Sequence, residues 1–146
     1  MIVVSACLAG VRCRYDGGAR LDDKVLALSK VEEFLPLCPE QLGGLPTPRP
    51  TAEIVGGGGD DVLSGKAKVV DMEGRDVTAQ FLRGAREALM IALEAGAKRA
   101  VLKEKSPSCG VRRVYRDGVL VTGEGVLTAL FMREGVEVIS DEELQV

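Results

Sequence analysis

The chain has 146 residues and a mass of 15.5 kDa, a length that predicts one domain, residues 1–146, with a substantial core. Its net charge of −3 and its aromatic content of 3% indicate neither a basic surface nor a stacking platform for nucleic acid. The chain has no histidine, which excludes Ser-His-Asp triads, Cys-His dyads and imidazole metal ligands.

The first third of the chain predicts two buried strands separated by a loop and a helix. Residues 2–6 are β-branched or small, which favours a buried strand, and this apolar run is too short for a membrane helix or a signal peptide. A loop over 7–18 contains an Asp-Gly turn signal. Asp22 is the expected N-cap of a helix over 23–31, and a second strand covers 34–37.

The rest of the chain continues to alternate between strands and helices. A stiff Gly/Pro stretch over 43–50 and a flexible glycine tip over 56–59 precede an expected hairpin over 62–72, around a glycine. Residues 76–95 form the clearest helix, because apolar residues recur every three or four positions. The remaining expected elements are a strand at 100–102, a hairpin at 114–121, a short helix at 125–132 and a strand at 136–139.

This alternation predicts an α/β fold: a three-layer domain with a mostly parallel, Rossmann-like sheet. Three cysteines follow predicted strands, namely Cys7, Cys38 and Cys109. The carboxyl ends of parallel strands share one edge of the sheet, where open α/β sheets place their sites. The three thiols are therefore expected to meet in one crevice, provided that none of their strands runs antiparallel.

Four cysteines without histidine restrict metal binding to thiolate and carboxylate ligands. The cysteines lack the close pairs of a structural zinc site, whereas iron–sulfur clusters accept thiolates that are scattered along the chain. Three thiolates leave one iron of a four-iron cluster open to substrate, and four favour electron transfer or a structural role. Cys13 is either a spare loop thiol or a ligand. Disulfides are disfavoured, because the chain is expected in the reducing cytoplasm.

Two groups of polar side chains lie beside the strand-end cysteines. Glu40 follows Cys38 by two residues, and Ser106 and Ser108 come just before Cys109. If the cysteines converge, these side chains line the same crevice. Their alternative roles are loop solvation for the glutamate and turn hydrogen bonds for the serines.

The remaining motifs support no nucleotide cofactor. Residues 56–59 lack the later glycine of a dinucleotide motif, and Gly65-Lys66-Ala67 lacks the Ser or Thr of a P-loop. Residues 123–125 open a helix whose N–H groups could hold an anion, but we expect a simple turn. Arg49 and Glu53 are expected to form a surface ion pair of little energetic consequence.

Several of these residues carry a family resemblance when they are read together. The motifs are Val4 to Gly10, Cys13 to Gly17, Cys38-Pro39-Glu40, residues 43–50, Glu53-Ile54 and Ser106 to Gly110. In this order they resemble the thiouracil desulfidase (TudS-like) family, over residues 3–54 and 99–128. The resemblance implies a [4Fe-4S] cluster held by Cys7, Cys38 and Cys109, with the fourth iron free to take sulfur from a thiolated uracil.

The predicted function is therefore that of a non-redox desulfidase, which converts 2-thiouracil or a related thiolated pyrimidine and water into uracil and hydrogen sulfide. Glu40 is the predicted general base, and Ser106 or Ser108 passes or donates a proton. The predicted partner is this small molecule, with no nucleic acid and no membrane. A non-catalytic four-cysteine module, holding zinc or a fully ligated cluster, is the alternative. The physiological substrate and the oligomeric state are left open.

Overall fold

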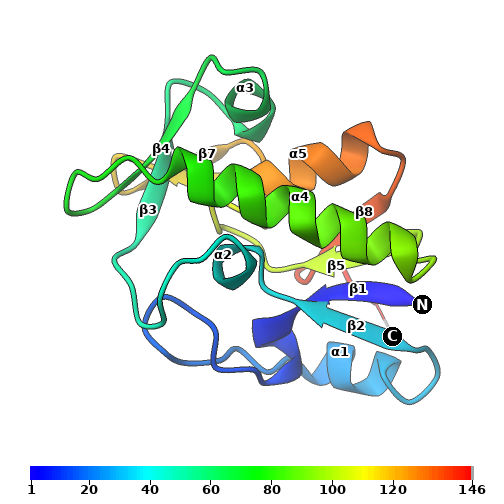
Figure 1. Cartoon of the computed structure of the whole chain (residues 1–146). Coiled ribbons are helices and arrows are strands. Elements are labelled where there is room, and N and C mark those ends of the chain that lie inside the picture. The colour runs from blue at the N-terminus through cyan, green and yellow to red at the C-terminus, as the bar shows by residue number, and fades with distance from the viewer. Residues whose placement is uncertain (146) are drawn as a thin grey trace.

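The computed structural model describes residues 1–145 and is built around a four-stranded sheet (Figure 1). The strands are β1 (Ile2–Ser5), β2 (Phe34–Leu37), β5 (Arg99–Leu102) and β8 (Glu137–Ser140). They lie in the order β2-β1-β5-β8, and each neighbouring pair is parallel. The predicted α/β fold with a parallel central sheet is confirmed.

Helices cover both faces of this sheet. They are α1 (Asp23–Leu28), α2 (Pro39–Leu42), α3 (Gly59–Leu63), α4 (Thr78–Glu94) and α5 (Val126–Arg133). Side chains alternate across a strand, so Val3 of β1 packs with α4 and α5 on one face, whereas Ile2 and Val4 pack with α1 on the other. All residues of β1 are buried, which explains its apolar run over residues 2–4.

Two antiparallel pairs form separate two-stranded sheets. They are β3 (Ala52–Val55) with β4 (Lys68–Asp71), and β6 (Arg113–Arg116) with β7 (Val119–Thr122). The second pair confirms the hairpin expected over 114–121. The hairpin expected over 62–72 is wrong, because residues 62–63 belong to α3 and residues 68–71 pair with β3 instead. The side chain of Asp61 accepts the N–H of Gly58 at 2.9 Å and so stabilises the start of α3.

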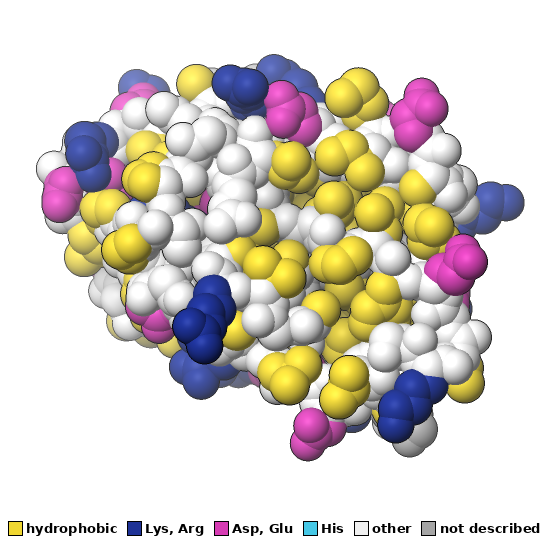
Figure 2. All heavy atoms as spheres, turned by 60° about the horizontal axis from the view of Figure 1, so that its bottom comes forward, with side chains coloured by type: hydrophobic (Ala, Val, Ile, Leu, Met, Phe, Trp, Pro, Cys, Tyr) yellow, Lys and Arg dark blue, Asp and Glu magenta, His cyan; other side chains and the backbone are white. Residues whose placement is uncertain are grey.

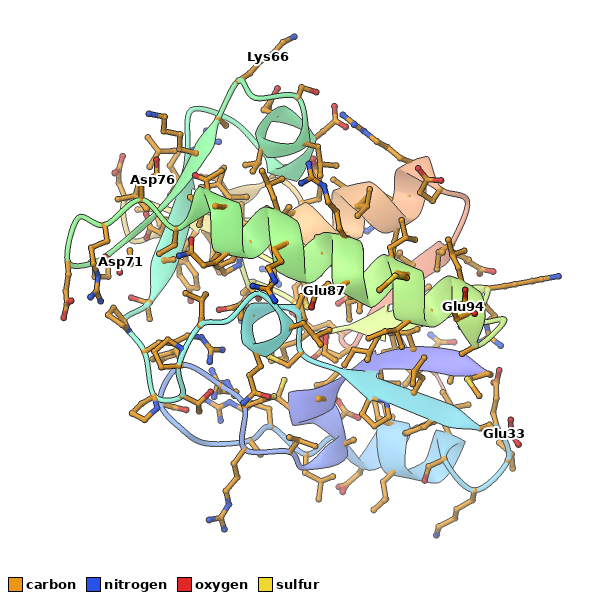
Figure 3. All side chains as sticks on the ribbon, viewed as in Figure 1. Glu33, Lys66, Asp71, Asp76, Glu87 and Glu94 are labelled. Atoms are coloured by element: carbon orange, nitrogen blue, oxygen red, sulfur yellow. The ribbon has the colours of Figure 1, made fainter. Side chains whose placement is uncertain are left out.

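Four other local expectations differ from the structure. The helix expected to reach residue 31 ends at Leu28. The long helix begins at Thr78, and Asp76, seen near its start in Figure 3, accepts the Thr78 N–H at 2.9 Å. The expected loop over 7–18 opens with the 3-10 helix η1 (Ala6–Ala9). The glycine tip is anchored rather than loose, because buried Gly59 packs against the backbone before α5.

The face that carries α1 gathers hydrophobic side chains (Figure 2). Leu26 of α1 and Val31, just beyond it, are exposed and lie outside the cleft described below. Within residues 1–145, no helix combines the length and the apolar character that crossing a bilayer requires.

Candidate active site

A cleft of about 850 Å³ lies at the carboxyl ends of the parallel strands. The candidate residues that line it are Cys7, Cys13, Cys38, Cys109, Glu40, Ser106 and Ser108. The parallel order of β2, β1 and β5 thus brings together side chains that are far apart in the sequence. All four cysteines are free thiols.

Two of the cysteines lie directly at strand ends. Cys7 is in η1, immediately after β1, and Cys38 follows β2 as the N-cap of α2. Pro39 occupies the first turn of α2. The N–H groups of a first turn have no acceptor within the helix, so a proline there costs no hydrogen bond. The short helix therefore begins at once and places Glu40 next to Cys38. α2 packs tightly on α4 because Gly84 has no side chain, and a Cβ there would collide with the Pro39 carbonyl.

Cys109 lies in the loop that follows β5, and the start of α5 holds this loop in place. The N–H of Leu127 donates to the Ser108 carbonyl at 2.9 Å. A Cβ at Gly125 would collide with the same carbonyl, so only glycine permits this close approach. The N–H groups at this helix start thus bind the protein's own carbonyl oxygens, which explains residues 123–125 without an anion.

Glu104 binds the backbone of residues 111–113, just after the same loop. The sequence did not point to this residue. Its side chain is buried, and Oε1 accepts the N–H groups of Val111, Arg112 and Arg113 at 2.7, 2.9 and 3.1 Å. Burial by itself raises the pKa of this carboxyl, but the three backbone hydrogen bonds outweigh burial and lower it. The position of Glu104 two residues after an apolar strand was the only signal in the sequence.

Cys13, Cys38 and Cys109 resist ionisation. Burial raises the pKa of Cys109 to about 12. Contact with Cys13, followed by burial, raises the pKa of Cys38 far above its usual range. For Cys13, contact with Cys38 lowers the pKa, but contact with Cys7 and burial outweigh this effect and raise it to about 11. These three thiols therefore keep their protons at neutral pH unless a bound metal displaces them.

A chain of hydrogen bonds connects the two serines to Glu40. Ser108 Oγ donates to Glu40 Oε2 at 2.7 Å and lies 2.9 Å from Ser106 Oγ. Ser106 Oγ also accepts the N–H groups of Ser108 and Cys109, each at 3.1 Å. Because Ser108 uses its single hydroxyl proton toward Glu40, Ser106 must be the donor within the serine pair. The chain is therefore oriented from Ser106 through Ser108 to the carboxylate.

Arg49 reaches the opposite side of the same carboxylate. Its side chain is only 4% exposed, and Nε donates to Glu40 Oε1 at 3.1 Å. The predicted surface pair between Arg49 and Glu53 is wrong. Glu53 instead accepts two backbone N–H groups at the tip of the β6–β7 hairpin, at 2.7 and 3.1 Å. Arg49 is buried and paired with Glu40 because the loop over 43–50 folds back onto α2.

Comparisons with known proteins show the family to which the chain belongs. The model of the 2-thiouracil desulfurase family matches residues 2–143. The chain belongs to this family. The resemblance inferred from the motifs is thereby confirmed. YbbK, an uncharacterized protein of Bacillus subtilis (strain 168), is 46% identical over 147 residues, which cover 99% of this chain and 97% of the relative.

A solved structure also has a fold similar to that of this chain. The [4Fe-4S]-dependent thiouracil desulfidase TudS matches it with a TM-score of 0.86 at 45% sequence identity. The match covers 98% of this chain and 91% of TudS. The parallel sheet therefore belongs to a fold that is shared with this enzyme.

Proposed function

We propose that this family member is a [4Fe-4S]-dependent desulfidase, which converts a thiolated pyrimidine such as 2-thiouracil and water into the oxo-pyrimidine and hydrogen sulfide. The observation that carries the proposal is the meeting of four free thiols with the Ser106–Ser108–Glu40 chain in one cleft. The similarity to TudS supports the cofactor and the class of substrate. Replacing C=S with C=O by water requires no net electron transfer.

The residues present fit a four-iron cluster better than a single ion. Within residues 1–145, no group of three or more His, Cys, Asp or Glu side chains has the spacing to hold one metal ion. A [4Fe-4S] cluster takes each thiolate on a different iron, so its ligands need not converge on a single point. We infer that Cys7, Cys38 and Cys109 are the ligands, because each follows a strand of the parallel sheet. Cys13, which lies deeper in the loop, stays outside this set.

The bound cluster would supply a Lewis-acidic iron with affinity for the soft sulfur of a thiocarbonyl. The chain's own residues handle the protons. Glu40 accepts a proton from the attacking water and is the general base. A proton that enters at Ser106 can move along the oriented hydroxyls through Ser108 to Oε2 of Glu40. Ser106 is the more exposed of the two serines and therefore forms the substrate end of this relay. The reverse transfer returns this proton to the departing sulfur, and the second proton of hydrogen sulfide comes from the added hydroxyl as it becomes the new C=O.

Anaerobic reconstitution followed by iron analysis and a sulfide-release assay with 2-thiouracil tests the proposal. Wild-type protein should hold about four irons per chain and release sulfide. Replacing Cys7, Cys38 or Cys109 by Ser should remove most of the iron and the activity. Cys13→Ser is the matched control and should retain both.

Two outcomes would contradict this assignment. Full activity in iron-free protein would show that the reaction does not need the cluster. Equal loss of iron in all four cysteine variants, without sulfide release by the wild type, would support the non-catalytic four-cysteine module. Absorbance spectra separate an iron–sulfur cluster from zinc in that case.

A further inference from the structure

Arg49 connects the loop that carries Cys13 with the helix that carries Glu40. Besides its bond to Glu40, Nη2 donates to the Cys13 carbonyl at 2.8 Å. Nη1 donates to the Pro46 carbonyl and to Thr47 Oγ1, at 3.2 and 3.0 Å. The guanidinium is therefore buried with all three nitrogens engaged, and its position is determined by contacts in three directions.

The two oxygens of Glu40 consequently have different partners. Oε1 accepts from Arg49, and Oε2 accepts from Ser108 at 2.7 Å. The last torsion of a glutamate side chain is broad, so a single contact does not determine which oxygen faces a given neighbour. With Arg49 bound to one oxygen, the other stays aligned with the serine relay.

Space for an alternative position of Glu40 lies directly behind it. A second cavity of about 250 Å³ is lined by Glu40 and Arg49, which also line the main cleft. The Glu40–Arg49 pair thus stands between the two cavities. Without the guanidinium, the carboxylate could turn into this second cavity, away from Ser108.

We propose that Arg49 is a positioning residue that holds Glu40 in the orientation in which Oε2 serves the serine relay. This inference rests on the proposed function of Glu40. A lysine cannot replace the arginine, because a single ammonium lacks the planar fork that reaches Glu40 and the Cys13 carbonyl together. Arg49 acts through Glu40 and does not itself contact the substrate.

A double-mutant cycle with Glu40→Gln tests the inference. In reconstituted protein, Arg49→Ala and Arg49→Lys should keep the wild-type iron content and KM, while kcat for sulfide release falls about 100-fold, the order expected for a misplaced catalytic group. In the Glu40→Gln background, Arg49→Ala should cause no further loss, because its target is already disabled. Arg75→Ala is the matched control, since Arg75 lines the second cavity without bonding to Glu40 and should leave kcat unchanged.

Three results would overturn the inference. The first is wild-type kcat in Arg49→Ala. The second is an equal decrease in kcat when Arg49→Ala is made in wild type and in the Glu40→Gln background, which would indicate an independent structural role. The third is loss of iron in both Arg49 variants, which would mean that Arg49 serves the cysteine loop instead.

A crystal structure of Arg49→Lys separates this inference from the proposed function, because it needs no activity. Glu40 Oε2 should move out of hydrogen-bond distance of Ser108 Oγ, and an unchanged contact would refute the positioning role. Iron-loaded wild-type protein that releases no sulfide would refute only the proposed function.

Discussion

The carboxylate of Glu104 offers the sharpest test of how the site is held together. Glu104→Gln preserves the shape of the side chain and one acceptor oxygen, but removes the charge. Three backbone N–H groups converge on Oε1 at 2.7–3.1 Å, and they belong to the segment that closes the Ser108–Cys109 loop. The substitution therefore weakens three hydrogen bonds at once without opening a cavity.

The expected magnitude follows from the difference between charged and neutral acceptors. A hydrogen bond to a charged group contributes about 1.5–3 kcal/mol, against about 0.5–1.5 kcal/mol for a neutral one, so each bond loses about 1 kcal/mol. The three donors share Oε1 with a fourth, the Lys105 N–H at 3.3 Å, and compete for its lone pairs, which reduces the expected total to about 2 kcal/mol. For a chain of this size, such a change lowers the Tm by about 4–8 °C.

Thermal unfolding of wild type and Glu104→Gln, measured by circular dichroism at several pH values, provides the assay. Both proteins are measured free of iron, so that acid release of metal does not contribute. The folded protein lowers the pKa of Glu104, and its carboxylate therefore stabilises the fold above the unfolded pKa of about 4.3. This stabilisation is lost as the pH falls through the folded pKa. The Tm difference should be full at neutral pH and should shrink below about pH 4.

Glu94→Gln is a suitable control, because Glu94 is exposed near the carboxyl-terminal end of α4 (Figure 3). Surface substitutions of this kind usually change stability by less than about 0.5 kcal/mol. A Tm decrease for Glu104→Gln no larger than that of the control would refute the reasoning. A decrease that stays the same in acid would show that the charge of Glu104 is not its cause.

Three further predictions concern the base, the loop contact and the ligand. Glu40→Gln should lower kcat for sulfide release about 10²–10⁴-fold with iron content unchanged, and wild-type turnover would place the base elsewhere. Gly125→Ala should lower the free energy of unfolding in urea by about 1–3 kcal/mol, because a Cβ there collides with the Ser108 carbonyl; an unchanged midpoint would show that α5 can shift away. By calorimetry, iron-loaded protein should bind 2-thiouracil more tightly than uracil, since only the former carries a soft sulfur, and equal affinities would argue against sulfur recognition.

The amino-acid sequence by itself determined the fold class and the position of the cysteines relative to the sheet. Apolar runs such as residues 2–6 and the helical period over 76–95 are local signals, readable within one element. Once strands and helices alternate, the parallel topology follows from the connections, and strand-end residues such as Cys7 and Cys38 must share one edge. The convergence of the thiols was therefore predictable without coordinates.

Tertiary structure alone decided the pairings between distant segments. Residues 68–71 form a strand with 52–55 rather than with their immediate neighbours, because strand partners are selected by long-range packing. Arg49 has the local appearance of a surface charge, and only the folding of its loop onto α2 buries it against Glu40. Three of the N–H donors that Glu104 collects lie 7 to 9 residues further along the chain. Propensity and periodicity describe a few consecutive residues, whereas burial and hydrogen-bond partners depend on which segments meet in space.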